Sequence, residues 1–167
     1  AAKGKLKAAI ASSAALAERM QTSKQEPRVL VVDDNDFVRK SVVSVLGQAE
    51  EIDVVAECGD GIDVAAVAQD VRPDVVVMDL QMPIMSGIDA AWILRSAQPS
   101  ARVLILSGLI TMQSVQEAAG AGASGYLQKD GDAVSLLQAV RIVAAGGTHW
   151  PRDMVLAGSH LQDSAQR

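Results

Sequence analysis

The hydrophobic residues of the chain gather in five short runs after Arg28, and a longer mixed segment separates each run from the next. The runs are residues 29–32, 52–56, 75–78, 103–106 and 126–127. Four of them are continuously apolar, which is typical of parallel strands that are covered by helices on both faces. The run at 52–56 alternates apolar and polar residues and therefore suits a strand at the edge of a sheet.

The segments between the runs repeat their apolar residues with a helical period. The apolar positions are Phe37, Val38, Val42, Val45 and Leu46; Ile62, Ala65, Ala66 and Val67; Ile88, Ala91 and Trp92; and Val134, Leu137, Val140, Val143 and Ala144. A further helix near Met112 to Ala119 has the weakest pattern. The expected N-caps are Asp36, Asp60, Ser86 and Asp132.

Some of these positions carry expectations about packing. Trp92 lies at helical spacing, and we expect it to pack in the core. In the last helix we expect Val134 and Val140 to face mostly toward the core, together with Leu137. That leaves Leu136 and Val143 for contacts with other molecules.

Five strand–helix units in about 120 residues predict an α/β fold with a doubly wound parallel sheet and helices on both faces. A closed barrel needs eight such units.

Composition narrows the class of protein. The chain has 167 residues, 49% of them hydrophobic and 21% charged, which excludes a disordered chain as a whole. A single cysteine, Cys58, excludes an internal disulfide and a cysteine-based zinc or iron–sulfur site. The net charge of −5 argues against nucleic-acid binding by the chain alone. The stretch from Val103 to Gln116 lacks charged residues but is shorter than the about 20 needed to cross a bilayer. We therefore expect a cytoplasmic protein with no membrane partner.

Residues 1–27 differ in charge from the rest, because five Lys or Arg residues there face only two Glu residues. This alanine-rich segment weakly resembles a secretory signal, and it could also form a weak amphipathic helix. We interpret it as a basic extension that precedes a boundary at Pro27.

The candidate chemistry lies at the ends of the predicted strands, because the functional crevice of an open α/β sheet lies beyond the carboxyl ends of its strands. Asp33 and Asp34 follow the first strand, Asp79 ends the third, Ser107 ends the fourth, and the fifth leads into Lys129. Clustered carboxylates repel one another unless a hard cation lies among them, and oxygen ligands suit Mg²⁺. A lysine and a hydroxyl can donate to phosphate oxygens. The pattern indicates Mg²⁺-assisted phosphoryl chemistry with a carboxylate as acceptor.

At these residues the chain resembles the receiver domain of bacterial two-component response regulators. The matching motifs are Asp33-Asp34, Met78-Asp79-Leu80-Gln81-Met82-Pro83 with Gly87, Leu106-Ser107-Gly108, and Gly125-Tyr126-Leu127-Gln128-Lys129-Asp130. The resemblance implies a flavodoxin-like sheet with strand order 2-1-3-4-5 over residues 28–145.

The resemblance also implies roles for single residues. Asp79 would be phosphorylated by a sensor histidine kinase. Mg²⁺, or Mn²⁺ as a substitute, would be held by Asp34, Asp79 and the backbone carbonyl of Gln81, with Asp33 acting through a water molecule. Ser107 and Lys129 would contact the phosphoryl group, and Ser107 and Tyr126 would form the conformational switch, with Tyr126 following inward.

The motif around Tyr126 and Lys129, followed by Gly146-Gly147 and Pro151, is most similar to the NarL/FixJ (LuxR-type) subgroup. Full-length members carry a C-terminal helix-turn-helix. The resemblance therefore implies that residues 146–167 begin a linker to an output domain absent from this chain, through which the protein would bind DNA and regulate transcription. Homodimerisation on phosphorylation is also implied.

Two alternatives stay open. One is a stand-alone receiver that signals through protein partners. The other is a haloacid-dehalogenase-like phosphatase with an Asp nucleophile, but such enzymes need a second Asp where this chain has Gln81. We therefore expect a switch module whose only catalysis is its own Mg²⁺-dependent phosphorylation and dephosphorylation.

Overall fold

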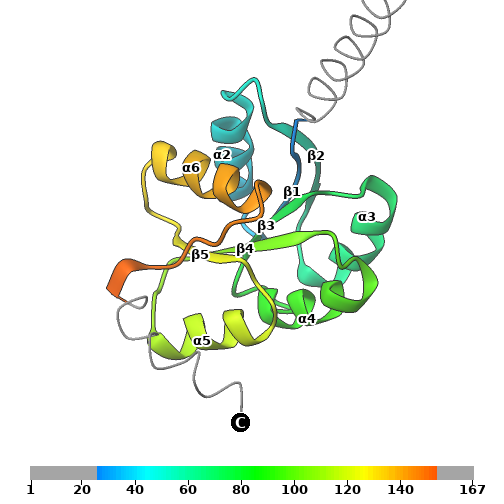
Figure 1. Ribbon diagram of the computed structural model, residues 1–167. Helices are drawn as coiled ribbons and strands as arrows, with labels where there is room; N and C mark the ends of the chain where they lie inside the picture. Colours follow the sequence, from blue (N-terminus) through cyan, green and yellow to red (C-terminus); the bar gives the residue numbers. More distant parts are fainter. Residues whose placement is uncertain (1–25, 154–167) are drawn as a thin grey trace, which may run out of the picture.

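The computed structural model describes residues 26–153 and shows one twisted sheet between two layers of helices (Figure 1). The predicted extension 1–27, apart from its last two residues, and residues 154–167 of the predicted linker lie outside the described residues. The strands are β1 (Arg28–Val32), β2 (Asp53–Cys58), β3 (Val75–Asp79), β4 (Arg102–Ser107) and β5 (Gly125–Gln128). The helices are α2 (Asp36–Gly47), η1 (Gly61–Asp63), α3 (Val64–Val71), α4 (Gly87–Ala97), α5 (Met112–Gly120) and α6 (Ala133–Ala144).

All five strands are parallel, and their order across the sheet is β2-β1-β3-β4-β5. This confirms the predicted doubly wound sheet and its strand order, with the alternating strand β2 at an edge. The central strand β3 is buried along its whole length, in agreement with its continuous run of apolar residues.

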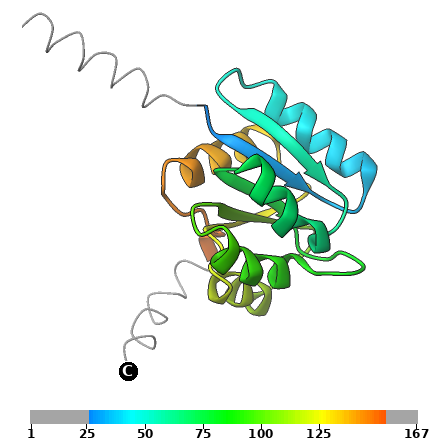
Figure 2. The same cartoon turned by 90° about the vertical axis from the view of Figure 1, so that its right-hand side faces the viewer.

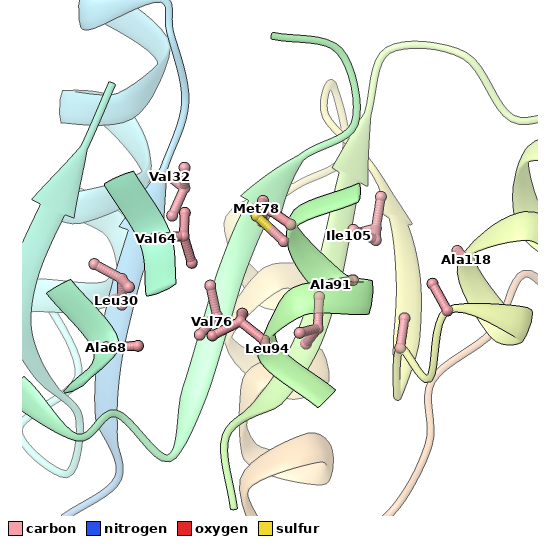
Figure 3. Packing of buried hydrophobic residues seen from close by; sticks show 14 of the residues in the cluster. Leu30, Val32, Val64, Ala68, Val76, Met78, Ala91, Leu94, Ile105 and Ala118 are labelled. Carbon is pink, nitrogen blue, oxygen red and sulfur yellow. The ribbon is translucent and has the colours of Figure 1, made fainter. Parts of the chain in front are cut away.

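The sheet separates two apolar cores. On one face α3, α4 and α5 cover alternate residues of the central strands, including Leu30, Val76 and Ile105 (Figure 3). On the other face α2 and α6 cover the residues between them, such as Val31 and Val77. Figure 2 shows α3 and α4 in front of the strands. Because all five strands are parallel, their carboxyl ends meet at one rim of the sheet.

One of the predicted N-caps is wrong, and a second caps a shorter helix than expected. Asn35, not Asp36, caps α2, because its side chain accepts the Val38 backbone N–H while Asp36 lies in the first turn. Asp60 caps the short η1 helix that precedes α3, and α3 itself has no side-chain cap. Ser86 and Asp132 cap α4 and α6 as predicted.

Two packing predictions are also wrong. Helix α4 buries Gly87, Ala90, Ala91 and Leu94, so Trp92 lies beside this stripe and is 50% exposed, with Arg95 over its ring. Helix α6 buries Leu136, Ala139, Val140 and Val143, whereas Val134 is 72% exposed. The apolar residues of α6 fit two neighbouring stripes, and only the contact with the sheet decides which one is buried.

The segment after α6 returns to the sheet. The His149 N–H donates to the Ser124 carbonyl at 3.0 Å, and the Tyr126 N–H donates to the His149 carbonyl at 2.8 Å. These bonds place residues around His149 alongside β5 (Figure 1). The exposed edge of β5 is thereby partly covered. Within the described residues, no helix is long and apolar enough to span a membrane.

Candidate functional site

Two carboxylates stand at the end of β1. The Asp33 N–H still donates to the Cys58 carbonyl at 3.1 Å and so extends the pairing with β2 by one residue. The Asp33 side chain turns inward, is almost fully buried, and accepts the Asn35 N–H at 2.8 Å. Asp34 is exposed at the rim. The two neighbouring carboxylates therefore have different environments.

Asp79 ends β3, at the centre of the sheet, and only 7% of it is exposed. Gly87 packs directly behind it, since a Cβ at Gly87 would lie 2.2 Å from the Asp79 carbonyl oxygen. Burial raises the pKa of the Asp79 carboxyl above its ordinary value, and the charge of Asp33 raises it further, against the opposing effect of Lys129. The ionised form of Asp79 is thus held at an energetic cost that a cation can offset.

Lys129 reaches the same rim from the loop between β5 and α6. Its ammonium group lies 2.7 Å from Asp33 Oδ2 and 3.1 Å from Asp79 Oδ2. Its backbone N–H donates to the Ser107 carbonyl at 2.9 Å, which ties the loop to the end of β4. Burial lowers the pKa of Lys129, but hydrogen bonds to Asp33 and Asp79 outweigh it and leave the pKa raised. Lys129 is therefore a cation that bridges the two buried carboxylates.

One carboxylate oxygen each from Asp33, Asp34 and Asp79 lies within 4.8 Å of the other two. Three such oxygens at the mouth of a crevice, with Asp34 open to solvent, are the ligand type that hard cations such as Mg²⁺ prefer. Lys129 supplies one positive charge against three negative ones, so the cluster retains an excess of negative charge. The residues present fit a divalent cation.

Ser107 and Gln81 lie beside this cluster. Together with residues of α5 and its preceding loop they line a depression of about 200 Å³. The backbone N–H of Gln81 acts to lower the pKa of Asp79, against the larger effect of burial. The Ser107 hydroxyl donates to the Leu109 carbonyl at 2.9 Å and accepts the Leu109 N–H at 3.2 Å. In this arrangement the hydroxyl of Ser107 is engaged by its own loop and not by the carboxylates.

Tyr126 is the largest fully buried side chain among the described residues. Its ring is already inside the protein, and its hydroxyl lies 2.8 Å from the Leu109 carbonyl oxygen and 3.0 Å from Ser114 Oγ. Ser114 and Thr111 form the capping box of α5. Tyr126 is therefore connected to both Ser107 and α5 through one short loop.

Sequence reasoning missed one contributor, Arg39 of α2. Its guanidinium donates to the Asp33 carbonyl at 2.8 Å, to Asp36 at 2.6 Å and to Glu57 of β2 at 3.2 Å. Arg39 thereby connects the loop after β1, which carries Asp33, to both α2 and β2. Only its spacing of three residues from Asp36 signalled one of these contacts.

Residues 29–141 match the response regulator receiver domain family. The chain belongs to this family. It is a receiver domain of the kind found in transcriptional response regulators, and the acidic cluster is of the kind that binds Mg²⁺ in receivers.

Individual relatives agree with the family match. The chain is 35% identical over 127 residues to the transcriptional regulatory protein LnrK of Bacillus subtilis, covering 76% of this chain and 58% of that protein. It is 40% identical over 119 residues to the DNA-binding transcriptional activator DevR/DosR of Mycobacterium tuberculosis, covering 71% of this chain and 55% of that protein. The receiver thus spans little more than half the length of these two relatives.

A solved structure has the same fold as this chain and is also similar to it in sequence. A two-component response regulator of the LuxR family from Aurantimonas sp. SI85-9A1 is 31% identical, with a TM-score of 0.75 over 81% of this chain and 97% of that one. The resemblance to the NarL/LuxR group is confirmed by these findings.

Proposed function

We propose that the chain is a phosphorylation-controlled switch in which Asp79 accepts a phosphoryl group from a sensor histidine kinase. The observation that carries this proposal is the position of Asp79, buried at the end of the central strand with the Lys129 ammonium 3.1 Å away. In the transfer, an Asp79 oxygen would form a bond to phosphorus while the P–N bond of the phosphohistidine breaks and its electron pair returns to the histidine. Lys129 would hold one phosphoryl oxygen by its charge.

We assign Mg²⁺ to Asp34, Asp79 and the backbone carbonyl of Gln81, with Asp33 acting through a water molecule. Bound Mg²⁺ would neutralise the repulsion among the carboxylates and the incoming phosphoryl oxygens. The environments of the two aspartates support this division. Asp33 is already engaged by Lys129 and by the Asn35 N–H, whereas Asp34 is exposed and free to bind a cation directly.

The switch would use Ser107 and Tyr126. On phosphorylation Ser107 would exchange its bond to the Leu109 carbonyl for one to the phosphoryl group, and this differential binding would select the active conformation. Because Tyr126 bonds to the same carbonyl, its environment would change in turn. The change would reach β5, α5 and the loop before α5. Exposed side chains there are Leu109 of this loop and Met112, the first residue of α5.

The output we propose is control of transcription. Relatives named as transcriptional regulators are longer than the matched region, which supports a receiver at 28–145, a linker beginning at 146–167 and a DNA-binding domain beyond it.

We further propose a cytoplasmic location and homodimerisation on phosphorylation. Sedimentation with and without beryllofluoride, which stands in for the phosphoryl group, tests dimerisation. A dimer that ignores beryllofluoride and disappears on removal of residues 1–27 would assign dimerisation to the extension.

The decisive experiment is Phos-tag electrophoresis after treatment with acetyl phosphate, with and without Mg²⁺. We expect a shifted band that needs Mg²⁺ and is absent in Asp79→Asn. Asp70→Asn is the matched control, since it removes the same charge from an exposed position of α3 and should phosphorylate normally. Phosphorylation of Asp79→Asn at the wild-type level would overturn the assignment. Hydrolysis of small phosphoesters with repeated turnover would instead favour a phosphatase.

A further inference from the structure

Asp60, in the turn after β2, is a buried carboxylate that joins two loops. One oxygen accepts the N–H groups of Ile62 and Met85, each at 2.9 Å, and the other accepts the N–H of Ile84 at 3.0 Å. Ile62 belongs to the same turn as Asp60, but Ile84 and Met85 belong to the loop between β3 and α4. The capping role expected from the sequence describes only the bond to Ile62.

The bonding of Asp60 is unusual for a charged group that is only 7% exposed. It forms no salt bridge within the described part of the chain, and backbone N–H groups alone hold its charge. Burial acts to raise its pKa, but the hydrogen bonds from Ile84, Ile62 and Met85 outweigh this and leave the pKa lowered. Asp60 is therefore an ionised hydrogen-bond acceptor that holds these three backbone amides in place.

The neighbouring glycine brings the two loops into close contact. A Cβ at Gly61 would lie 2.5 Å from the Met85 carbonyl oxygen and 3.1 Å from that of Ser86. No side chain fits between the turn and the loop without moving one of them. The hydrogen bonds of Asp60 and the absence of a side chain at Gly61 thus act on the same contact.

The loop held by Asp60 is the one that leaves the phosphorylation site. It starts directly after Asp79, carries Gln81, and is closed at its base by the Gly87 N–H, which donates to the Leu80 carbonyl at 2.9 Å. The loop is thereby fixed at two places, at its base by this bond and at Ile84 and Met85 by Asp60. The path of residues 81–83 between these places sets where the Gln81 carbonyl points.

We propose that Asp60 is a positioning residue for the metal site: by fixing the loop between β3 and α4, it places the Gln81 carbonyl for Mg²⁺. This inference rests on the proposed function, because it takes that carbonyl as a metal ligand. Groups that orient ligands of a metal typically contribute tenfold to hundredfold to its affinity.

The test compares Mg²⁺ affinities measured by titration of backbone amide chemical shifts. We expect Asp60→Ala to weaken Mg²⁺ binding by about tenfold or more. Asp60→Asn keeps one oxygen for Ile62 and Met85 but cannot accept from Ile84, so its loss should be smaller. Phosphorylation by acetyl phosphate should recover in both variants at saturating Mg²⁺. Asp63→Asn is the matched control, because this exposed residue of the same turn forms no capping bond and its loss should leave Mg²⁺ affinity unchanged.

A second pair of variants moves the loop without changing any charge. Gly61→Ala pushes against the Met85 carbonyl and should also weaken Mg²⁺ binding, whereas a Cβ at Gly59 meets only Arg39 at 3.9 Å. Gly59→Ala should therefore bind Mg²⁺ like the wild type.

The wild-type chain supplies a measurement that needs no variant. Coupling between two sites is reciprocal, so Mg²⁺ should slow hydrogen exchange of the Ile84 and Met85 amides. Wild-type Mg²⁺ affinity in Asp60→Asn and Gly61→Ala, or exchange at Ile84 and Met85 that ignores bound Mg²⁺, would overturn the inference and leave Asp60 a structural residue. A wild-type chain that binds no Mg²⁺ would instead contradict the proposed function.

Discussion

The hydroxyl groups of Ser107 and Tyr126 share one acceptor, the carbonyl oxygen of Leu109, at 2.9 Å and 2.8 Å. The two residues are far apart in the sequence and belong to neighbouring strands, β4 and β5. A change in either hydroxyl alters the bond available to the other. The loop that holds Leu109 is therefore the physical connection between the phosphorylation site and Tyr126.

This connection predicts an energetic coupling between the two side chains. Tyr126→Phe removes a buried hydroxyl with two partners and should lower the free energy of unfolding by about 1 to 2 kcal/mol. In a double-mutant cycle with Ser107→Ala, urea unfolding should give a coupling of about 0.5 to 1 kcal/mol. Strict additivity of the two substitutions would show that the shared acceptor carries no coupling.

The two aspartates at the end of β1 should differ in their contributions: Asp34 mainly to Mg²⁺ affinity, and Asp33 mainly to the stability of the metal-free protein. Asp34→Ala should weaken Mg²⁺ binding more than Asp33→Ala, because exposed Asp34 is the proposed direct ligand. Asp33→Ala should cost more stability without metal, about 1 to 3 kcal/mol, since it removes the 2.7 Å partner of Lys129 and the acceptor of the Asn35 N–H. Calorimetric Mg²⁺ titration and urea unfolding measure the two effects. Equal or reversed Mg²⁺ affinities would mean that the ligand roles are misassigned.

Lys129 should stabilise the metal-free protein and compete with the metal. Lys129→Met leaves Asp33 and Asp79 without their cation and should lower the free energy of unfolding in Mg²⁺-free buffer by about 1 to 3 kcal/mol. The same substitution makes the site more negative, so Mg²⁺ should bind at least about threefold more tightly. Thermal unfolding along a Mg²⁺ titration measures both effects. Weaker Mg²⁺ binding in Lys129→Met would contradict this competition.

The close contact between Gly87 and the Asp79 carbonyl predicts that Gly87 cannot be replaced without a loss of stability. Gly87→Ala brings a methyl group to 2.2 Å from the Asp79 carbonyl and should destabilise the protein by about 1 to 3 kcal/mol. Gly108→Ala is a suitable control, because a Cβ there meets nothing within 4 Å and should change stability by less than about 0.5 kcal/mol. Urea unfolding compares the two. Similar stabilities would mean that β3 and α4 can separate freely at this point.

The lowered pKa of Asp60 predicts a stability contribution that depends on pH. A carboxyl group whose pKa is lower in the folded state stabilises the protein above the unfolded-state value, near 3.8, and loses this contribution as the pH falls through its folded pKa. The difference in unfolding free energy between wild type and Asp60→Asn should be constant above about pH 5 and shrink below about pH 4. A difference that stays constant to about pH 3 would rule out this contribution.

Local pattern was enough to predict the sheet. A continuous apolar run such as that of β3 is stable only when helices cover both faces, and Asp79 must then stand at the carboxyl end of a buried strand. The alternation in β2 placed it at an edge for the same reason. The candidate site followed, because parallel strands bring their carboxyl ends to one rim wherever they lie in the chain.

Local pattern failed where two arrangements fit equally well. The apolar residues of α6 form two adjacent stripes, and Leu136 rather than Val134 is buried because the helix meets the sheet on that side. Trp92 keeps helical spacing but lies outside the stripe through Ala91 and Leu94. Which face of a helix is buried depends both on the helix surface and on the sheet surface that it meets. The sequence of the helix alone therefore does not determine it.

The sequence by itself determined the strand ends and the residues that cluster there, since chain direction and the apolar covering of the strands decide both. Only the tertiary structure decided which groups these residues contact. Asp60 looks like an ordinary cap in the sequence, yet the loop it holds begins about 20 residues later and meets it only because α3 returns the chain to the sheet. The shared carbonyl of Leu109 likewise depends on the register between β4 and β5. Hydrogen bonds between distant segments act over a few ångströms, so they exist only once packing has brought those segments together.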